Sequence, residues 1–339
     1  MPSYVQSIVA EGLCKSYGGH HAIRDLSFSV NRGEVVGFLG PNGAGKSTTM
    51  QILTGLLEAT SGEAYVAGYA VARNPAAVKR AIGYMPENNP LPEEMRVREY
   101  LRHRARLKGL DRRTTRSRVE EVLDLCDLQR KAARKLIRSL SKGFRQRVGI
   151  ADAIIGRPEV TILDEPTIGL DPHQVLVMRR LVERIREHTT ILLSSHILAE
   201  VEISCDRVLI LSQGRLVAAG TPTELRREFI RNHRYIAEVR GESAALRREV
   251  AAVHAELAVT RVGEPDEDGF YSAEIECPLA EDFAEPLLQR LHACPALRLR
   301  ALARRQPSLE DIFLAATKRS WELEMNGSVT QTAQSGSAA

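Results

Sequence analysis

The sequence contains no long uninterrupted apolar run. A helix that crosses a bilayer needs about 20 consecutive, mainly apolar residues, and no stretch of the 339 residues approaches that length. The first residues, Met1–Tyr4, also lack a basic start followed by an apolar block, so no signal peptide is expected. We therefore expect a cytoplasmic protein, for which any role at a membrane depends on a partner.

Paired cysteines and a strong charge of one sign are absent as well. Five cysteines are scattered without a C-x-x-C pair, which fits a reducing compartment and no metal framework. Lys and Arg number 47 against 43 Asp and Glu, and a formal charge of +4 does not by itself indicate nucleic-acid or membrane binding. The 43% hydrophobic content is ample for a core, and the length indicates one large domain or two ordinary ones.

A glycine-rich segment is the most informative feature that is present. Residues 40–48 fit G-x-x-x-x-G-K-[ST], the phosphate-binding loop, between a predicted buried strand at 34–39 and a predicted helix at 47–53. Glycines let consecutive backbone N–H groups converge on a phosphate, and the helix adds its positive dipole end. We expect Lys46 to reach the β- and γ-phosphates and the Ser47 hydroxyl to bind Mg²⁺. The expected nucleotide-binding residues are Gly40, Pro41, Asn42, Gly43, Ala44, Gly45, Lys46, Ser47 and Thr48. The sequence thus predicts a protein that binds a nucleoside triphosphate.

Two carboxylates follow a second buried strand, residues 160–163. Adjacent acids at the end of a core strand are costly unless they have a function. Asp164 is expected to hold Mg²⁺, directly or through water, and Glu165 to polarise the water that attacks the γ-phosphate. A further strand at 189–195 ends at His196, which could contact a γ-phosphate or be structural.

Two weaker signals leave alternatives open. Alternating apolar and polar positions over residues 5–35 predict antiparallel strands. Tyr17 in this region could stack on a nucleotide base, although an edge-strand packing role is favoured for an isolated tyrosine. Ser141 opens a predicted helix and is a good N-cap residue, so it is either a second phosphate-facing group or an ordinary cap.

Residues 93–138 are charged and predicted to be helical. Ten Lys and Arg residues fall between Arg96 and Arg118. Such a run is either a nucleic-acid surface or a solvated helical face. The second interpretation is favoured because no series of aromatic residues alternates with the basic ones to provide stacking platforms.

The order and spacing of these motifs resemble ATP-binding cassette (ABC) ATPases over about residues 5–230. The segment Leu140–Phe144 resembles the signature that other phosphate-loop classes lack, and residues 84–88 and 140–147 resemble the ABC-2 export branch, which includes drug-resistance and gliding-motility subunits. The resemblance implies an α/β fold, a phosphate-loop ABC ATPase with an antiparallel β subdomain and a helical subdomain at about 90–150.

The resemblance also implies residue roles. Tyr17 stacks on adenine, Asp171 lies at a dimer interface, and Ser141 and Gly143 face the nucleotide held by a second subunit. The implied catalytic residues are Glu165 as base, His196 on the γ-phosphate, and Lys46. The implied cofactors are ATP and Mg²⁺, with Ser47, Glu87 and Asp164 as metal residues.

Three positions depart from the family pattern. Lys142 replaces the usual middle glycine of the signature, and Phe144 replaces its usual closing glutamine. Glu87 stands where a glutamine is usual; its oxygens can still reach Mg²⁺, but it cannot donate a hydrogen bond. We expect Glu87 to keep a role in sensing the metal.

The C-terminal part has a different composition. Predicted elements in residues 231–322 follow the order β-α-β-β-α-β, which suits a small ferredoxin-like α+β domain after an ABC domain at 1–230. Regulation, dimer contact and passive stabilisation remain open roles for this domain. Residues 323–339 are expected to be a disordered tail.

Together these features predict the ATP-hydrolysing subunit of an ABC exporter. The expected partners are transmembrane permease subunits and a second ATP-binding subunit in a homodimer, at the cytoplasmic face of the membrane, with no nucleic acid. The alternative is a soluble ABC ATPase that acts on ribosomes or nucleic acid. Such proteins usually carry two cassettes or a long coiled coil, and neither is present in the sequence. The cargo is not predicted.

Overall fold

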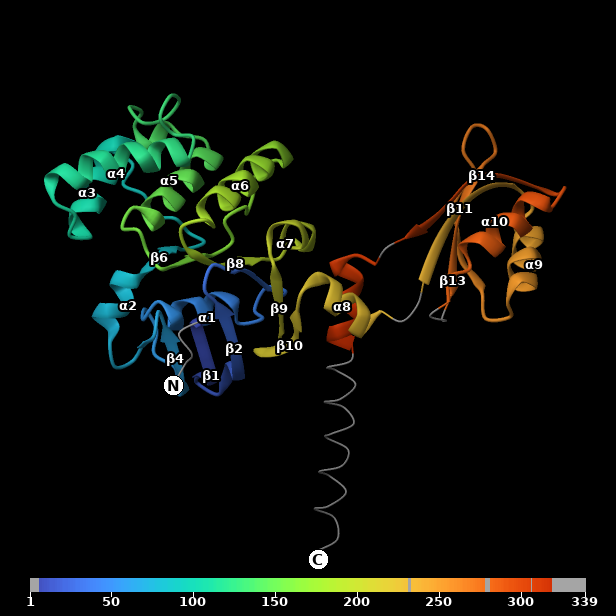
Figure 1. Cartoon of the computed structure of the whole chain (residues 1–339), viewed down its shortest axis with the longest axis horizontal. Helices are drawn as coiled ribbons and strands as arrows, with labels where there is room; N and C mark the ends of the chain where they lie inside the picture. The colour runs from blue at the N-terminus through green and yellow to red at the C-terminus, as the bar shows by residue number, and fades with distance from the viewer. Residues whose placement is uncertain (1–5, 231–232, 278–280, 306, 319–339) are drawn as a thin grey trace, which may run out of the picture. The chain divides into compact units, whose positions relative to one another are not determined.

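The computed structural model describes residues 6–230, 233–277, 281–305 and 307–318. Residue contacts divide the chain into two units, Met1–Pro222 and Thr223–Ala339, and each is described by itself (Figure 1). The predicted boundary at residue 230 stays a prediction, and the predicted tail at 323–339 lies outside the described residues.

A six-stranded sheet forms the centre of the first unit, in the order β10-β9-β3-β8-β7-β6. All neighbours are parallel except β10, which pairs with β9 in the antiparallel sense. Every residue of β3, β7 and β8 is buried, as expected for parallel strands covered on both faces. The strands are β3 (Val35–Leu39), β6 (Ile82–Met85), β7 (Val160–Leu163), β8 (Thr190–Ser195), β9 (Arg207–Ser212) and β10 (Arg215–Gly220).

A four-stranded antiparallel sheet, in the order β2-β1-β4-β5, shares a core with the first sheet. The ring centroids of Phe28 on β2 and Phe38 on β3 lie 5.4 Å apart, which joins the two sheets at this core. The elements of this region are β1 (Gln6–Tyr17), β2 (His20–Asn31), α1 (Lys46–Leu53), β4 (Ser61–Val66), β5 (Tyr69–Ala70) and α2 (Pro75–Ala81).

Helices make up the rest of the first unit. α3, α4 and α5 group together apart from the antiparallel sheet (Figure 1). Each buries an apolar stripe, for example Val119, Val122 and Leu123 on α4. The helices are α3 (Val97–Leu107), α4 (Arg112–Leu125), a 3₁₀ turn (Ile137–Ser139), α5 (Lys142–Ile154), α6 (Pro172–Ile185) and α7 (Leu198–Ser204).

The second unit has its own sheet and its own core. Its antiparallel strands follow the order β12-β13-β11-β14, and α9 and α10 contribute Leu246 and Leu287 to the buried cluster. Tyr235 at its centre is fully buried, and its hydroxyl donates to Asp282 Oδ1 at 2.8 Å. The elements are β11 (His233–Gly241), α9 (Ser243–Val253), β12 (Ala258–Val262), β13 (Tyr271–Cys277), α10 (Ala284–Ala293) and β14 (Leu297–Arg305), with α8 (Pro222–Phe229) before them and a helix at 309–318 after them.

Candidate functional site

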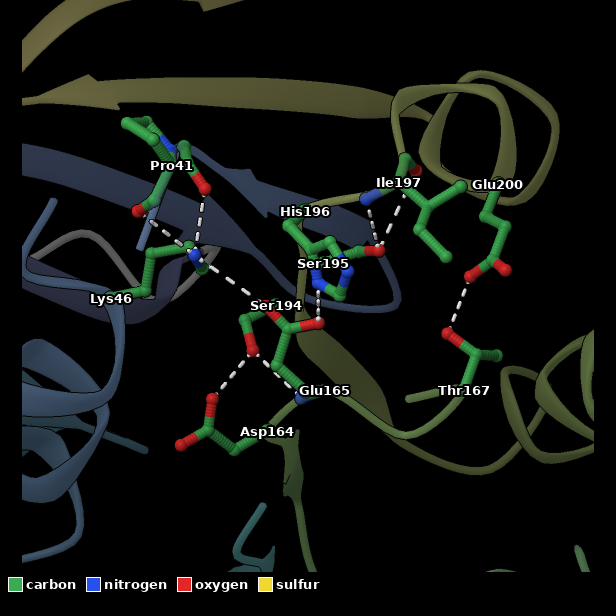
Figure 2. Close-up of polar contacts among 11 residues, drawn as sticks. Pro41, Lys46, Asp164, Glu165, Thr167, Ser194, Ser195, His196, Ile197 and Glu200 are labelled. Carbon is green, nitrogen blue, oxygen red and sulfur yellow. Dashed lines mark hydrogen bonds and ion pairs between the residues drawn. The ribbon is translucent and has the colours of Figure 1, made fainter. Parts of the chain in front are cut away.

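The glycine-rich segment links β3 to α1. Gly45 has φ of 101°, and a Cβ there would lie 2.7 Å from the Ala22 carbonyl oxygen, so both the turn and the packing require glycine. Lys46 is only 6% exposed, and its Nζ donates to the carbonyl oxygens of Gly40 at 2.7 Å and Pro41 at 3.3 Å (Figure 2). The backbone therefore folds around the ammonium group of Lys46.

Three charged or titratable side chains meet beside this loop. Lys46 Nζ lies 3.5 Å from Glu165 Oε1, and His196 Nδ1 lies 2.8 Å from Glu165 Oε2 (Figure 2). Lys46 begins α1 after β3, Glu165 follows β7, and His196 follows β8. These strands are parallel neighbours, so their carboxyl ends meet at one edge of the sheet. Glu165, Lys46 and His196, predicted separately, are thus adjacent.

Asp164 and Glu165 are positioned by a serine that the sequence analysis did not identify. Ser194 Oγ donates to Asp164 Oδ1 at 2.6 Å and accepts from the Glu165 backbone N–H at 2.8 Å. Asp164 is only 1% exposed. The available signal was Ser194 itself, a hydroxyl directly after the apolar residues Ile191–Leu193 of β8.

The sequence analysis also missed Glu200, a further carboxylate near this centre. Thr167 Oγ1 donates to Glu200 Oε2, which joins the loop after β7 to the first turn of α7 (Figure 2). Burial raises the pKa of Glu200 above its usual value, and the Thr167 hydrogen bond and His196 oppose that rise. Glu200 therefore carries a proton more readily than a solvated glutamate.

The expected metal residues offer oxygen donors only. Ser47 follows Lys46 on α1, Asp164 follows β7, and Glu87 is exposed after β6. Burial raises the pKa of Tyr84 to about 12, and the negative charges of Asp164 and Glu87 add to that rise. Hydroxyl and carboxylate oxygens are the ligands that Mg²⁺ prefers, so the donor set fits that ion. Their role as metal residues stays a prediction.

The signature residues lie at the start of α5. Ser141 is the N-cap residue, but its side chain makes no cap hydrogen bond, so the alternative of an ordinary cap is disfavoured. A Cβ on Gly143 would lie 2.5 Å from Gln174 Oε1, so glycine permits close approach of α5 and α6. Among the described residues, no hydrogen bond or ion pair joins Ser141 or Gly143 to Lys46 or Glu165. Within the described residues, the signature therefore shares no polar contact with the Lys46 centre.

The unusual signature residues make specific contacts. A Cβ on Gly169 would lie 2.3 Å from Lys142 Nζ, so the lysine extends across the loop between β7 and α6. The Arg147 guanidinium lies 4.1 Å from the centroid of the Phe144 ring, a cation–π arrangement one turn along α5. Lys142 and Phe144 thus give α5 two contacts, one with the loop between β7 and α6 and one with Arg147, that a glycine and a glutamine would not make.

Two other expected nucleotide residues have local contacts. The Asp171 carboxylate caps α6 by accepting from the Gln174 N–H at 2.9 Å. Tyr17 is 47% exposed, and Lys15 Nζ lies 5.2 Å from its ring centroid. Their roles at a dimer interface and on adenine stay predictions.

Comparison with known proteins identifies the family. The family model described as ABC transporter matches residues 23–168. A Nod factor export ATP-binding protein I from Ralstonia nicotianae is 35% identical over 310 residues, which covers 91% of this chain and 93% of that protein. The chain belongs to the ABC transporter family. The predicted resemblance to export-type ABC ATP-binding proteins, and the predicted function as such a subunit, are confirmed.

Two other similarities cover about two thirds of the chain. ABC transporter A family member 1 from Dictyostelium discoideum is 40% identical over 209 residues, which cover 62% of this chain and 24% of that protein. The chain thus spans about a quarter of that relative. A structure described as the ATP binding subunit of an ABC transporter is 38% identical, with a TM-score of 0.59 over 66% of this chain and 92% of the other. The predicted ABC ATPase fold is confirmed.

Proposed function

We propose that this ABC ATPase hydrolyses Mg²⁺-bound ATP and that the resulting association and release of two ATP-binding subunits drives export through separate permease subunits. The observation that supports the proposal is the meeting of Lys46, Glu165 and His196 at one edge of the central sheet. An ammonium group, a carboxylate and an imidazole at that edge match the needs of phosphoryl transfer.

Each side chain has a distinct task in this mechanism. Glu165 accepts a proton from the attacking water, and the His196 imidazole, 2.8 Å away, orients the Glu165 carboxylate. Lys46 stabilises the negative charge that develops on the transferred phosphate. Ser47, Asp164 and Glu87 would hold Mg²⁺, which neutralises charge on the β- and γ-phosphate oxygens when bound.

The signature completes the site of a second subunit in this proposal. Ser141 has no cap hydrogen bond, so its hydroxyl and the N–H groups at the start of α5 can bind an anion. The lack of a polar contact between Ser141 and Lys46 among the described residues supports a site built from two chains. We propose a homodimer because one chain carries both halves.

The permease is proposed as a separate protein at the cell membrane, where this subunit works on the cytoplasmic face. No helix in the described parts of the chain is long and apolar enough to cross a bilayer.

The decisive experiment replaces the proposed base. Glu165→Gln is expected to lower ATP turnover by about 10²- to 10⁴-fold, while MgATP binding persists and a dimer accumulates in light scattering. Glu187→Gln, at an exposed glutamate outside the site, is the matched control and should hydrolyse ATP normally. Native turnover by Glu165→Gln would contradict the assignment of the base, and a monomer at saturating MgATP would contradict the dimer.

A further inference from the structure

The basic residues between Arg96 and Arg118 divide into two groups. One group makes polar contacts within the first unit: Arg104 Nε lies 2.6 Å from Asp152 Oδ1, and the Arg118 guanidinium donates to the carbonyl oxygens of Ile154 and Ile155. The same group includes Arg96, which donates to the Arg134 carbonyl, Arg98, which pairs with Glu120, and Lys108, which donates to the Ile82 carbonyl. These five residues position the helices.

The other five residues face solvent. They form what we call the α3–α4 basic patch: Arg102, Arg106, Arg112, Arg113 and Arg116. All are exposed, and within the part of the chain that the structure describes their side chains make no hydrogen bond or ion pair. α3 and α4 pack against each other at the outer end of the helical group, which brings the end of α3 and the start of α4 into one surface (Figure 1).

The patch has almost no countercharge of its own. Asp111 is the single acidic residue between 102 and 116. Its carboxylate already accepts from the Arg113 N–H at 2.8 Å and from the Thr114 N–H and hydroxyl at 3.0 and 2.7 Å. The exposed N-terminus of α4 adds the positive end of a helix dipole. Five arginines and a helix start therefore produce a local positive potential that the modest net charge of the chain conceals.

An apolar side chain lies within the same surface. Leu107, the last residue of α3, is 65% exposed between Arg106 and the start of α4. Residues 101–116 contain no Phe, Tyr or Trp on which a nucleic-acid base could stack. Arginines around an exposed leucine match the interface of a lipid bilayer, where anionic headgroups lie above acyl chains.

We propose that the α3–α4 basic patch binds the anionic headgroups of a phospholipid bilayer, with Leu107 inserted among them. The membrane setting follows from the proposed function, but lipid binding itself requires neither ATP nor a permease. The surface would hold the subunit at the bilayer and orient its first unit there. Because the patch is remote in sequence from Lys46 and Glu165, its loss should leave ATP hydrolysis without lipid unchanged.

Vesicle flotation of the full chain tests the proposal. Vesicles of 70% phosphatidylcholine and 30% phosphatidylglycerol should carry the native protein, and pure phosphatidylcholine vesicles or 0.5 M salt should not. A triple variant, Arg102→Gln, Arg106→Gln and Arg113→Gln, should bind these vesicles about 100-fold more weakly, because each charge near the surface contributes a factor of about 5. The matched control, Arg32→Gln, Arg180→Gln and Arg248→Gln, removes three exposed arginines elsewhere and should bind as the native chain does.

Several results would overturn the proposal. Equal binding losses in the two triple variants would show that only net charge matters. Binding to neutral vesicles as tight as to anionic ones would exclude headgroup recognition. A triple variant that loses affinity for single-stranded RNA but not for vesicles would assign the patch to nucleic acid. Failure of ATP hydrolysis in the native chain would instead count against the proposed function, since flotation is measured without ATP.

Discussion

Ser194 connects the Asp164 carboxylate to the backbone of Glu165. Its hydroxyl binds the Asp164 side chain and the Glu165 backbone at once. A single group therefore fixes the spacing between the proposed metal residue and the proposed base. Figure 2 shows Ser194 between them, on the strand that also leads to His196.

Replacing this serine should impair the site and the fold together. Ser194→Ala leaves the buried Glu165 N–H without its acceptor, which should lower the free energy of unfolding by about 1–3 kcal/mol. Loss of the orienting contact should lower kcat by about 10- to 100-fold. Chemical denaturation and steady-state ATPase assays measure the two effects.

Ser195→Ala is the matched control for this variant. Ser195 is also buried at the end of β8, but its hydroxyl accepts from the Ile197 N–H instead of binding Asp164. Its kcat should stay within about threefold of the native value, below the loss that a group orienting the site produces. Equal kcat values for the two variants would contradict the role of Ser194.

At the level of elements, parallel strands bring together residues that are distant in the sequence. Adjacent residues, such as the 40–48 loop or the Asp164–Glu165 pair, could be predicted because each is read from one continuous segment. The contacts of Ser194 and of Glu200 could not, since they span about 30 residues and depend on the register of β7 and β8. Element ends were also misjudged by a residue: the strand predicted at 34–39 begins at Val35, and the helix predicted at 47–53 begins at Lys46.

The link between α7 and the loop after β7 should depend on pH. Burial raises the folded-state pKa of Glu200 above the unfolded value, so the folded state is relatively stabilised while Glu200 is protonated. This contribution is present below the unfolded pKa of about 4.5 and is lost as pH rises through the folded pKa. Glu200→Gln mimics the protonated form. This variant should therefore become more stable than the native chain as the pH rises through the folded-state pKa of Glu200. Urea unfolding across pH 4 to 8 measures the difference, and a constant difference across that range would contradict the shift.

Among the residues that the structure describes, each unit has a hydrophobic core that shares no residue with the core in the other unit. One joins the two sheets of the first unit, and the other surrounds Tyr235 and Ile275 in the second unit. Every residue proposed for ATP hydrolysis belongs to the first unit. The second unit has the β-α-β-β-α-β order expected from the sequence. Regulation, dimer contact and passive stabilisation stay the three predicted roles for this unit.

An ATP site that takes Ser141 and Glu165 from different copies of the chain has a genetic consequence. If each ATP site takes Glu165 from one copy and Ser141 from the other, Glu165→Gln and Ser141→Arg each damage both sites of their own homodimer. A mixed dimer of the two variants holds one doubly damaged site and one intact site. Two inactive alleles should therefore complement each other, restoring up to about a quarter of native ATPase activity after random pairing. Refolding the two purified variants together and measuring phosphate release would reveal it, whereas a chain that completes its own site would show no complementation.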